Sequence, residues 1–176
     1  LHVSSLENLP EMGNLLLDNG AELDVADKYG YSALHLAIDQ NSFLAADELL
    51  AAGAKVNSHA EWGHTPLHTS VASGNIQIVK NILGEGAEIN STDRLGRTPL
   101  HWAAEKGHLK IAKFLINKGS KINTPDNQGE TPMHDAAQWN QVKIVELLIS
   151  KNGDVNAKGS DGRAPLHLAI ANGNLD

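Results

Sequence analysis

Short apolar segments alternate along the chain with polar segments that contain glycine. In a representative apolar segment, Ile78, Val79, Ile82 and Leu83 are spaced so that they form one stripe on a helix. The polar segments, such as residues 87–96, hold turn-forming residues and one aliphatic residue of the kind that is usually buried, which is typical of an extended, hairpin-like loop. The pattern therefore predicts short amphipathic helices separated by extended loops.

The pattern repeats every 33 residues without an insertion. The period is clearest in a column of histidines: His2, His35, His68, His101, His134 and His167. Two further columns contain only glycine or asparagine: Gly20, Gly53, Gly86, Gly119 and Asn152, and then Asn8, Asn41, Gly74, Gly107, Asn140 and Gly173. Because Gly and Asn accept the left-handed conformation that closes a helix most readily, both columns predict helix C-termini.

The repeating unit also carries a signal for the start of its first helix. Thr65-Pro66 and Thr98-Pro99 place a capping hydroxyl before a proline at the first helical position, where no hydrogen-bond donor is lost. In the last unit Ala164 replaces this threonine, which removes a cap worth about 1 kcal/mol. Each unit is thus predicted to run helix, helix, loop.

The repeated motif resembles the ankyrin repeat, which has the same period. The resemblance rests on Thr98-Pro99-Leu100-His101-Trp102-Ala103-Ala104, followed by Gly107-His108, Gly119 and Asp126-Asn127-Gln128-Gly129. It implies an all-α fold, an ankyrin-repeat solenoid of stacked helix-turn-helix units with hairpin-like loops. It also implies that the histidine column makes hydrogen bonds between neighbouring loops. His108 falls on the Gly-His pair of the motif, and we give it a structural role as well.

We expect one ankyrin-repeat domain over residues 1–176. Its repeats cover residues 1–26 (partial), 27–59, 60–92, 93–125, 126–158 and 159–176 (partial). Both ends cut a repeat, and neither shows the polar outer face of a terminal repeat. We therefore expect this sequence to be a window of a longer array.

Composition and motif searches give no sign of catalysis. The chain has no Cys, so it has neither a disulfide framework nor a Cys-ligated metal. It also lacks a phosphate-binding loop, a zinc-binding helix motif and a nucleophile elbow. His59, Glu61 and His64 share one predicted loop and could bind a divalent metal, but no fourth ligand is evident. We predict no catalytic residue, no metal site, no cofactor and no enzymatic activity.

The charge pattern favours a protein partner. Residues 1–59 hold nine acidic and two basic side chains, whereas residues 60–176 hold twelve of each, giving a net charge of -7. An acidic chain without a basic stripe argues against nucleic acid. No apolar run approaches the ~18 residues of a membrane span, so we expect no membrane insertion. We expect a cytoplasmic monomer that binds another protein.

The resemblance also implies where a partner binds. In ankyrin repeats the hairpin tips and the exposed side of the first helices line a concave groove. Aromatic residues and Arg, which dominate binding hot spots, are concentrated at the matching positions of this chain. The candidate binding residues are Tyr29, Tyr31, Trp62, His64, Arg94, Arg97, Trp102, Glu105, Gln138 and Trp139. The alternative for Trp102 and Trp139 is that they pack against the next repeat.

The preferred hypothesis is a non-enzymatic protein–protein interaction scaffold that binds its partner through the concave hairpin-and-first-helix surface. One alternative is a targeting or substrate-recruitment module of a larger enzyme, toxin or channel whose active part lies outside these residues. Another is that the array is the substrate of a modifying enzyme. Resemblance to ankyrin repeats implies that loop asparagines can be hydroxylated, and the candidates are Asn57, Asn90, Asn123 and Asn156.

Overall fold

The computed structural model describes residues 10–174, and every regular element in this range is a helix. The prediction of an all-α fold is confirmed. The helices are α2 (Pro10–Asp18), α3 (Ala33–Asp39), α4 (Phe43–Ala51), α5 (Pro66–Ala72), α6 (Ile76–Gly84), α7 (Pro99–Lys106), α8 (Leu109–Asn117), α9 (Pro132–Gln138), α10 (Val142–Ser150) and α11 (Pro165–Ala171). Helices this short are marginal in isolation, so they depend on packing against one another.

The first helix of each repeat starts where the sequence places its cap. At α5, Thr65 has an extended backbone and its hydroxyl accepts a hydrogen bond from the backbone N–H of His68. Thr98 and Thr131 occupy the same position before α7 and α9. Helix α11 begins at Pro165 although Ala164 has no hydroxyl, because the proline and the packing of the helix suffice.

The helices end at the glycines and asparagines of the two columns. Asn41, Asn140 and Asn152 have φ values of 56°, 53° and 62°, which lie in the left-handed region that few residues other than glycine accept. The glycines of the same columns also have positive φ in the described residues. The predicted helix C-termini are confirmed, except that Asn8 lies outside the described part of the chain.

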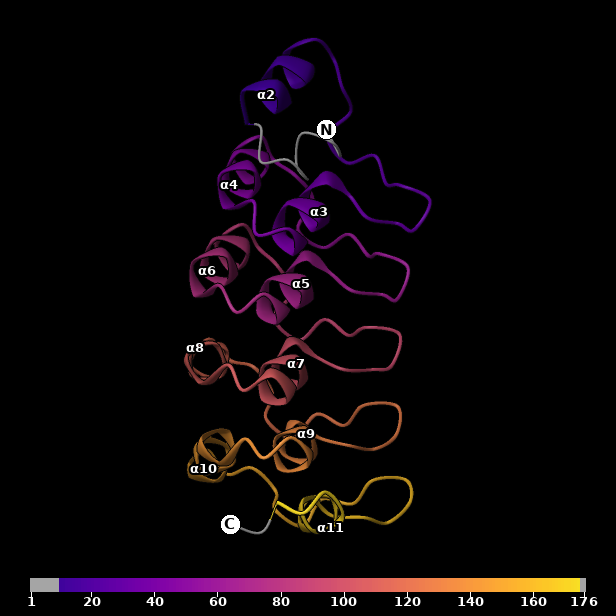
Figure 1. Cartoon of the computed structure of the whole chain (residues 1–176), viewed down its shortest axis with the longest axis vertical. Coiled ribbons are helices and arrows are strands. Elements are labelled where there is room, and N and C mark those ends of the chain that lie inside the picture. Colours follow the sequence, from indigo (N-terminus) through magenta and orange to yellow (C-terminus); the bar gives the residue numbers. More distant parts are fainter. Residues whose placement is uncertain (1–9, 175–176) are drawn as a thin grey trace. The chain divides into compact units, whose positions relative to one another are not determined.

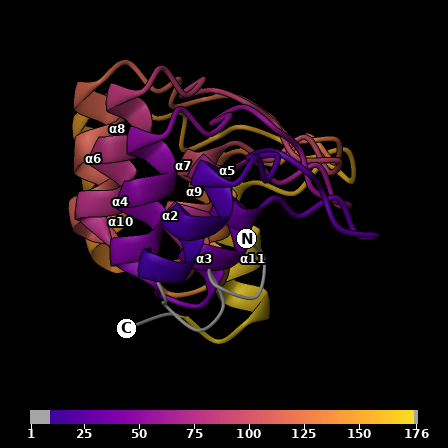
Figure 2. The ribbon, with the colours of Figure 1, turned by 90° about the horizontal axis from the view of Figure 1, so that it is seen from above.

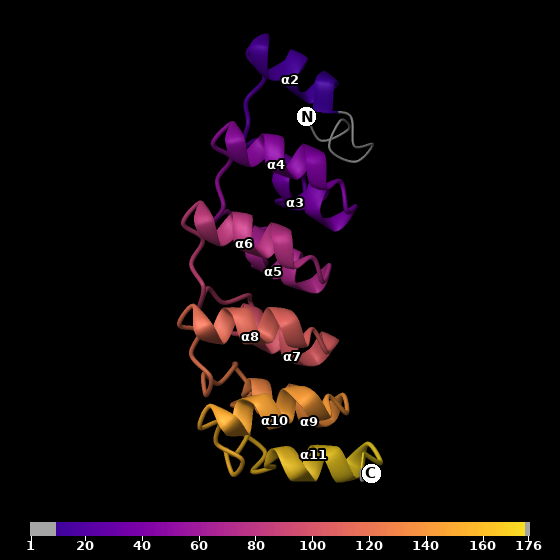
Figure 3. The same cartoon turned by 90° about the vertical axis from the view of Figure 1, so that its left-hand side faces the viewer.

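The chain divides into two compact units between Glu88 and Ile89. In the first unit, α3 packs against α4 and α5, while α4 also contacts α2 and α6. Figure 3 shows the second helices α4 and α6 in front of the first helices α3 and α5. The core between these two layers includes the fully buried side chains of Leu34, Leu67 and Ile82.

The second unit has the same two-layer arrangement. Helix α9 packs against α7, α10 and α11, and α8 contacts both α7 and α10. The core is formed by aliphatic residues from both layers: Leu100, Ile111, Leu115, Ile144 and Leu148. Because aliphatic side chains fill the core, the few aromatic residues are left for other positions.

The segments between repeats form hairpin-like loops without strands in the described range. Each loop is closed by its own backbone, as when the N–H of Asp126 donates to the carbonyl of Glu130 at 2.8 Å. Adjacent loops of a unit are also joined, since Asn127 N–H donates to the carbonyl of Leu95 at 2.9 Å. Within each unit the loops project on the side of the first helices and extend well beyond them (Figures 1 and 2).

Candidate protein-binding site

The histidine column positions the loops on which the candidate residues lie. The Nδ1 atom of His101 accepts a hydrogen bond from the backbone N–H of Thr98 at 3.0 Å. Its Nε2 atom lies 3.1 Å from the carbonyl oxygen of Glu130 in the next loop. Because a carbonyl can only accept, Nε2 carries the proton and the ring is neutral. Burial lowers the pKa of His101 to about 4.

Two more histidines make the same bridge. The Nε2 atom of His35 lies 3.1 Å from the carbonyl oxygen of His64, and that of His134 lies 3.2 Å from the carbonyl oxygen of Arg163. The predicted bridging role is confirmed for His35, His101 and His134. His2 lies outside the described residues, and His167 is exposed.

Loop asparagines join consecutive repeats within each unit. The side chain of Asn57 donates to the carbonyl of Gly86 and accepts from the N–H of Glu88 at 2.9 Å. Asn123 does the same with Asn152 and Asp154. Asn90 accepts from the N–H of Lys121. The sequence indicated these residues only as modification candidates, whereas the structure gives Asn57, Asn90 and Asn123 a structural role.

The candidate residues of the first unit lie on two neighbouring hairpins. Tyr29 is 48% exposed, with the Lys28 ammonium 4.8 Å from its ring centroid. Trp62, on the next hairpin, is 59% exposed. Tyr31 is half-buried and packs edge-on against the ring of His35, and His64 is half-buried near His68. The two hairpins are joined by a hydrogen bond from the N–H of Glu61 to the carbonyl of Tyr29 at 2.7 Å.

The possible metal ligands do not come together. Over residues 10–174, no group of three or more His, Cys, Asp or Glu side chains is arranged to hold a metal ion. His59 and Glu61 are both exposed.

None of the described helices is long and apolar enough to cross a bilayer.

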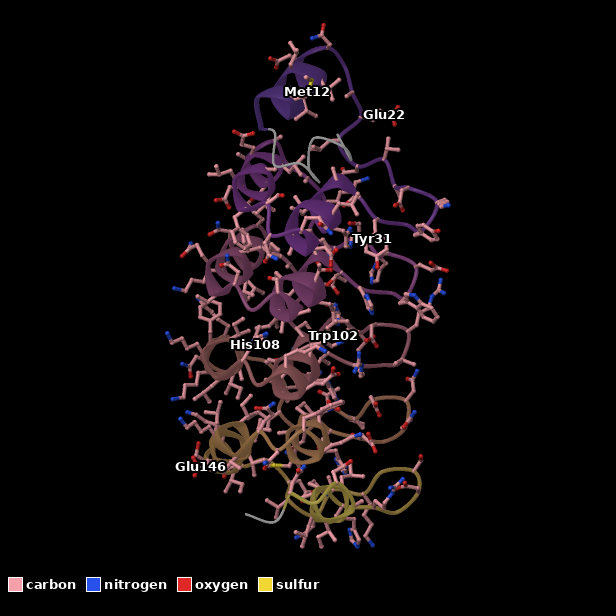
Figure 4. The ribbon with its side chains drawn as sticks, viewed as in Figure 1. Met12, Glu22, Tyr31, Trp102, His108 and Glu146 are labelled. Atoms are coloured by element: carbon pink, nitrogen blue, oxygen red, sulfur yellow. The ribbon has the colours of Figure 1, made fainter. Side chains whose placement is uncertain are left out.

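In the second unit, Arg97 holds several candidate residues together. Its guanidinium lies 2.7 Å from a carboxylate oxygen of Glu105 and 3.3 Å from Oδ2 of Asp93. It also lies over the ring of Trp102, 4.8 Å from the centroid, and the indole N–H donates to the same Asp93 oxygen at 3.0 Å. Trp102 is half-buried on α7 (Figure 4). Arg97 therefore makes direct contacts with both Trp102 and Glu105.

The acidity of Glu105 reflects these contacts. Burial acts to raise its pKa, but the hydrogen bond and charge of Lys106, 2.7 Å away, together with Arg97, outweigh burial and lower the pKa. Glu105 is therefore a carboxylate at neutral pH, and both its oxygens are engaged, one with each cation.

The second unit contains a pocket of about 270 Å³ beside this cluster. It brings together four of the predicted residues, Arg97, Glu105, Gln138 and Trp139, but not Arg94 or Trp102. Arg94 is exposed, and its carbonyl accepts from the Asn127 side chain at 2.9 Å. The complete lining is Leu95, Arg97, Glu105, Asp126, Asn127, Gln128, Glu130, Asp135, Gln138 and Trp139.

Asp135 is a pocket residue for which sequence reasoning predicted no binding role. It lies in the first turn of α9 and is only 7% exposed. Its Oδ2 atom is buried without a hydrogen-bond partner among the described residues. Burial raises the pKa of Asp135 to about 8, partly offset by the charge of Arg97 and reinforced by Glu105, Glu130 and Asp126.

A signal for Asp135 was present in the sequence. It occupies the position after the column histidine, where the other described repeats have Leu36, Thr69, Trp102 and Leu168. A carboxylate in this otherwise uncharged column marks a place where repeating structure does not explain the residue.

Comparison with known proteins accounts for the repeats. A family model described as ankyrin repeats, which contains three copies of the repeat, matches residues 1–93 and again residues 67–159. A search of curated proteins gave no match to the chain.

Proposed function

Because the chain belongs to the ankyrin-repeat family, we propose that it is a non-enzymatic scaffold that binds another protein through its hairpin loops and first helices. Ankyrin repeats are in general protein–protein interaction modules. In this chain the interface would lie on the surface that is concave in this family, and the second helices would lie outside it.

The location of the exposed aromatic side chains carries this proposal. All seven aromatic residues of the chain lie in the described range, and three of them are exposed: Tyr29, Trp62 and Trp139, at 48%, 59% and 55%. Tyr29 and Trp62 lie at hairpin tips, and Trp139 follows the end of first helix α9. An exposed aromatic ring contributes little to the hydrophobic core, so its mutation should not destabilise the fold. On binding, the same ring buries a large surface area.

The mechanism is the display of side chains whose positions are already fixed. Loops closed by their own hydrogen bonds, and joined to their neighbours, lose less conformational entropy on binding than free loops. The side chains of Arg97, Trp102 and Glu105 are held by one another in the same way. Ordering these groups therefore takes little away from the free energy of binding.

Photo-crosslinking tests the proposal before the partner has been identified. A photoreactive phenylalanine analogue replaces Trp62 or Trp139 in one set of proteins, and Lys110 or Lys113 on α8 in the control set. Both lysines are exposed on a second helix. We expect the first set to form a common crosslinked product that the control set does not form. A product formed only by the α8 set would place the interface on the second helices.

A further inference from the structure

The pocket beside the Arg97 cluster is lined mainly by acidic groups among its charged residues. Its lining includes four carboxyl groups, those of Glu105, Asp126, Glu130 and Asp135, against one cation, Arg97. The side chains come from two hairpin loops and from helices α7 and α9. Some of these carboxyl groups already have partners among the described residues, and the others do not.

Two of the four carboxyl groups are engaged by the protein itself. Glu105 pairs with Arg97 and Lys106, both at 2.7 Å. Asp126 uses Oδ1 to accept the backbone N–H groups of Gln128 and Glu130 at 2.8 and 2.9 Å, which shapes its own loop. These two groups stabilise the walls of the pocket.

The other two carboxyl groups are available to a guest. Asp135 Oδ2 is buried and has no hydrogen-bond partner in the described part of the chain, and the side chain is more than nine-tenths buried. The carboxyl group of Glu130, on the adjacent loop, makes no hydrogen bond or ion pair between residues 10 and 174, and burial raises its pKa. A buried acceptor without a donor has lost the hydrogen bonds that it makes in water, so a donor that enters the pocket restores them.

The residues that line the pocket indicate which chemical class of ligand it can bind. A metal ion needs several ligands that converge, and no suitable group of three occurs among residues 10–174. The rim has the exposed side chains of Leu95 and Trp139, at 54% and 55%, which suit an alkyl stem and an adjacent positive charge. The guest should therefore have an apolar stem and a cationic end that donates hydrogen bonds.

We infer that this pocket receives the cationic end of a lysine or arginine side chain of a partner protein, with Asp135 and Glu130 as its acceptors and Trp139 beside its stem. The inference rests on the proposed function, because the side chain belongs to the protein that the scaffold binds.

The protonation of Asp135 gives the inference a distinct signature. With a pKa of about 8, its carboxyl group is mostly neutral at pH 7 when the pocket is empty. The charged groups around it are Arg97 and Asp126 from the loops, Glu105 from α7 and Glu130 from the adjoining loop. An entering cation favours the carboxylate, so binding releases a proton.

The test uses three small probes on the whole chain, followed by NMR. Nα-acetyl-lysine methylamide and Nα-acetyl-arginine methylamide carry the cation, and Nα-acetyl-norleucine methylamide is the uncharged control. We expect the two cationic probes, or one of them, to shift the indole signal of Trp139 and the carboxyl signals of Asp135 and Glu130. The norleucine probe should shift none of these, and the comparison of lysine with arginine identifies the guest.

Two variants and a pH series complete the design. Asp135→Asn keeps the size of the side chain and should weaken the cationic probes about tenfold, as expected for a charged hydrogen bond. Glu146→Gln removes one exposed charge on α10, away from the loops, and should change nothing (Figure 4). From pH 7 to pH 8 the ionised fraction of Asp135 rises about fivefold, so affinity should rise about fivefold in the wild type and stay flat in Asp135→Asn.

The inference is wrong if the cationic probes bind no better than norleucine, or if Asp135→Asn behaves like Glu146→Gln. Zn²⁺ or Mg²⁺ alone shifting the same signals would replace it with a metal site. These results are separate from those of the crosslinking experiment. Crosslinks at Trp62 and Trp139 without probe binding would support the scaffold and reject the inference about the pocket. Probe binding without crosslinks would show that the pocket binds cations, but it would reject the proposed interface and, with it, a partner side chain as the guest.

Discussion

At the residue scale, the histidine column shows how one side chain fixes both a helix start and a loop. His101 accepts from the helix N-terminus through Nδ1 and donates to the next loop through Nε2. His101→Ala leaves both groups without a partner, so we predict a loss of about 1–3 kcal/mol in the free energy of unfolding. Urea denaturation measures this loss. His59→Ala, at an exposed loop position, is the control, and an equal midpoint for both variants would refute the bridging role.

The same histidines make stability depend on pH. Burial lowers the pKa of His35 and His101 from 6.5 to about 4, so between these values the unfolded chain binds protons that the folded chain does not. Their contribution to stability is complete above pH 6.5 and is lost as the pH falls towards 4. We predict that the His101→Gln variant loses less stability between pH 7 and pH 4.5 than the wild type does. Denaturation curves at both pH values provide the comparison.

Asp135 should make stability depend on pH in the opposite direction from His35 and His101. Its pKa is raised to about 8, so the folded chain keeps a proton that the unfolded chain has released above about pH 4. Its contribution is favourable at low pH and is lost as the pH rises towards 8. We predict that Asp135→Asn stabilises the protein at pH 8 by about 1–3 kcal/mol, with a smaller gain at pH 4. Thermal unfolding at the two pH values checks this, and destabilisation at pH 8 would show that the acid has an internal partner.

The role of the histidines could be predicted from the sequence, whereas that of Asp135 could not, and the difference has a physical reason. A residue that recurs in every repeat must do something that every repeat needs, so the role of the column could be predicted. The burial of Asp135 depends on how the loops and α7 close over α9, which no spacing in the sequence reveals. The burial of its Oδ2 atom without a hydrogen-bond partner among the described residues supports a role in binding, since functional sites are where local structural rules are broken.

At the element scale, caps define the helices, and Ala164 offers a test of one cap. Thr65 caps α5 with its hydroxyl, whereas Ala164 provides only an extended backbone with φ −93° and ψ 166° before α11. Threonine accepts this conformation, so Ala164→Thr should stabilise the chain by about 1 kcal/mol. Thermal unfolding measures the gain. Ala164→Val, which has the same shape without the hydroxyl, should give no gain, and equal effects would attribute the change to packing.

Elements were predictable where they depend on local chemistry. Thr-Pro pairs and Gly or Asn residues act within one turn, so the starts of the first helices and the helix ends at the two Gly/Asn columns followed from the sequence. The network of Arg97, Asp93, Glu105 and Trp102 joins a loop to α7, and its geometry was not predictable from spacing. Sequence reasoning selected Arg97 and Trp102 as binding residues but did not foresee that each already contacts the other.

At the scale of the molecule, stability comes from contacts between neighbouring repeats. Within the second unit, α9 has α7 on one side and α11 on the other, and α11 retains exposed apolar side chains such as Leu166 at 64%. We predict that the amide hydrogens of α11 exchange faster than those of α9. Hydrogen exchange resolved by residue tests this, and equal protection of the two helices would contradict nearest-neighbour stacking. Fast exchange is also predicted for residues 1 to about 12, of which residues 1–9 lie outside the described structure.

The repeat architecture could be predicted because its period is unbroken, but the binding surface could only be proposed. The proposed surface is tested by measuring how tightly the partner, once crosslinking has identified it, binds single alanine variants of this chain. We predict that at least two of Tyr29, Tyr31, Trp62, Arg94, Arg97 and Trp139 weaken binding by about 2 kcal/mol or more. Tyr29, Trp62 and Trp139 are exposed, so their loss should leave stability unchanged.

The most direct measurement compares Trp62→Ala and Trp139→Ala with the double variant Lys110→Ala/Lys113→Ala by calorimetric titration of the partner. The lysines are exposed on α8, outside the proposed surface. We predict a loss of affinity of about thirtyfold or more for the tryptophan variants and little change for the lysine variant. Neutral tryptophan variants together with a lysine variant that no longer binds would place the interface on the second helices and contradict the proposal.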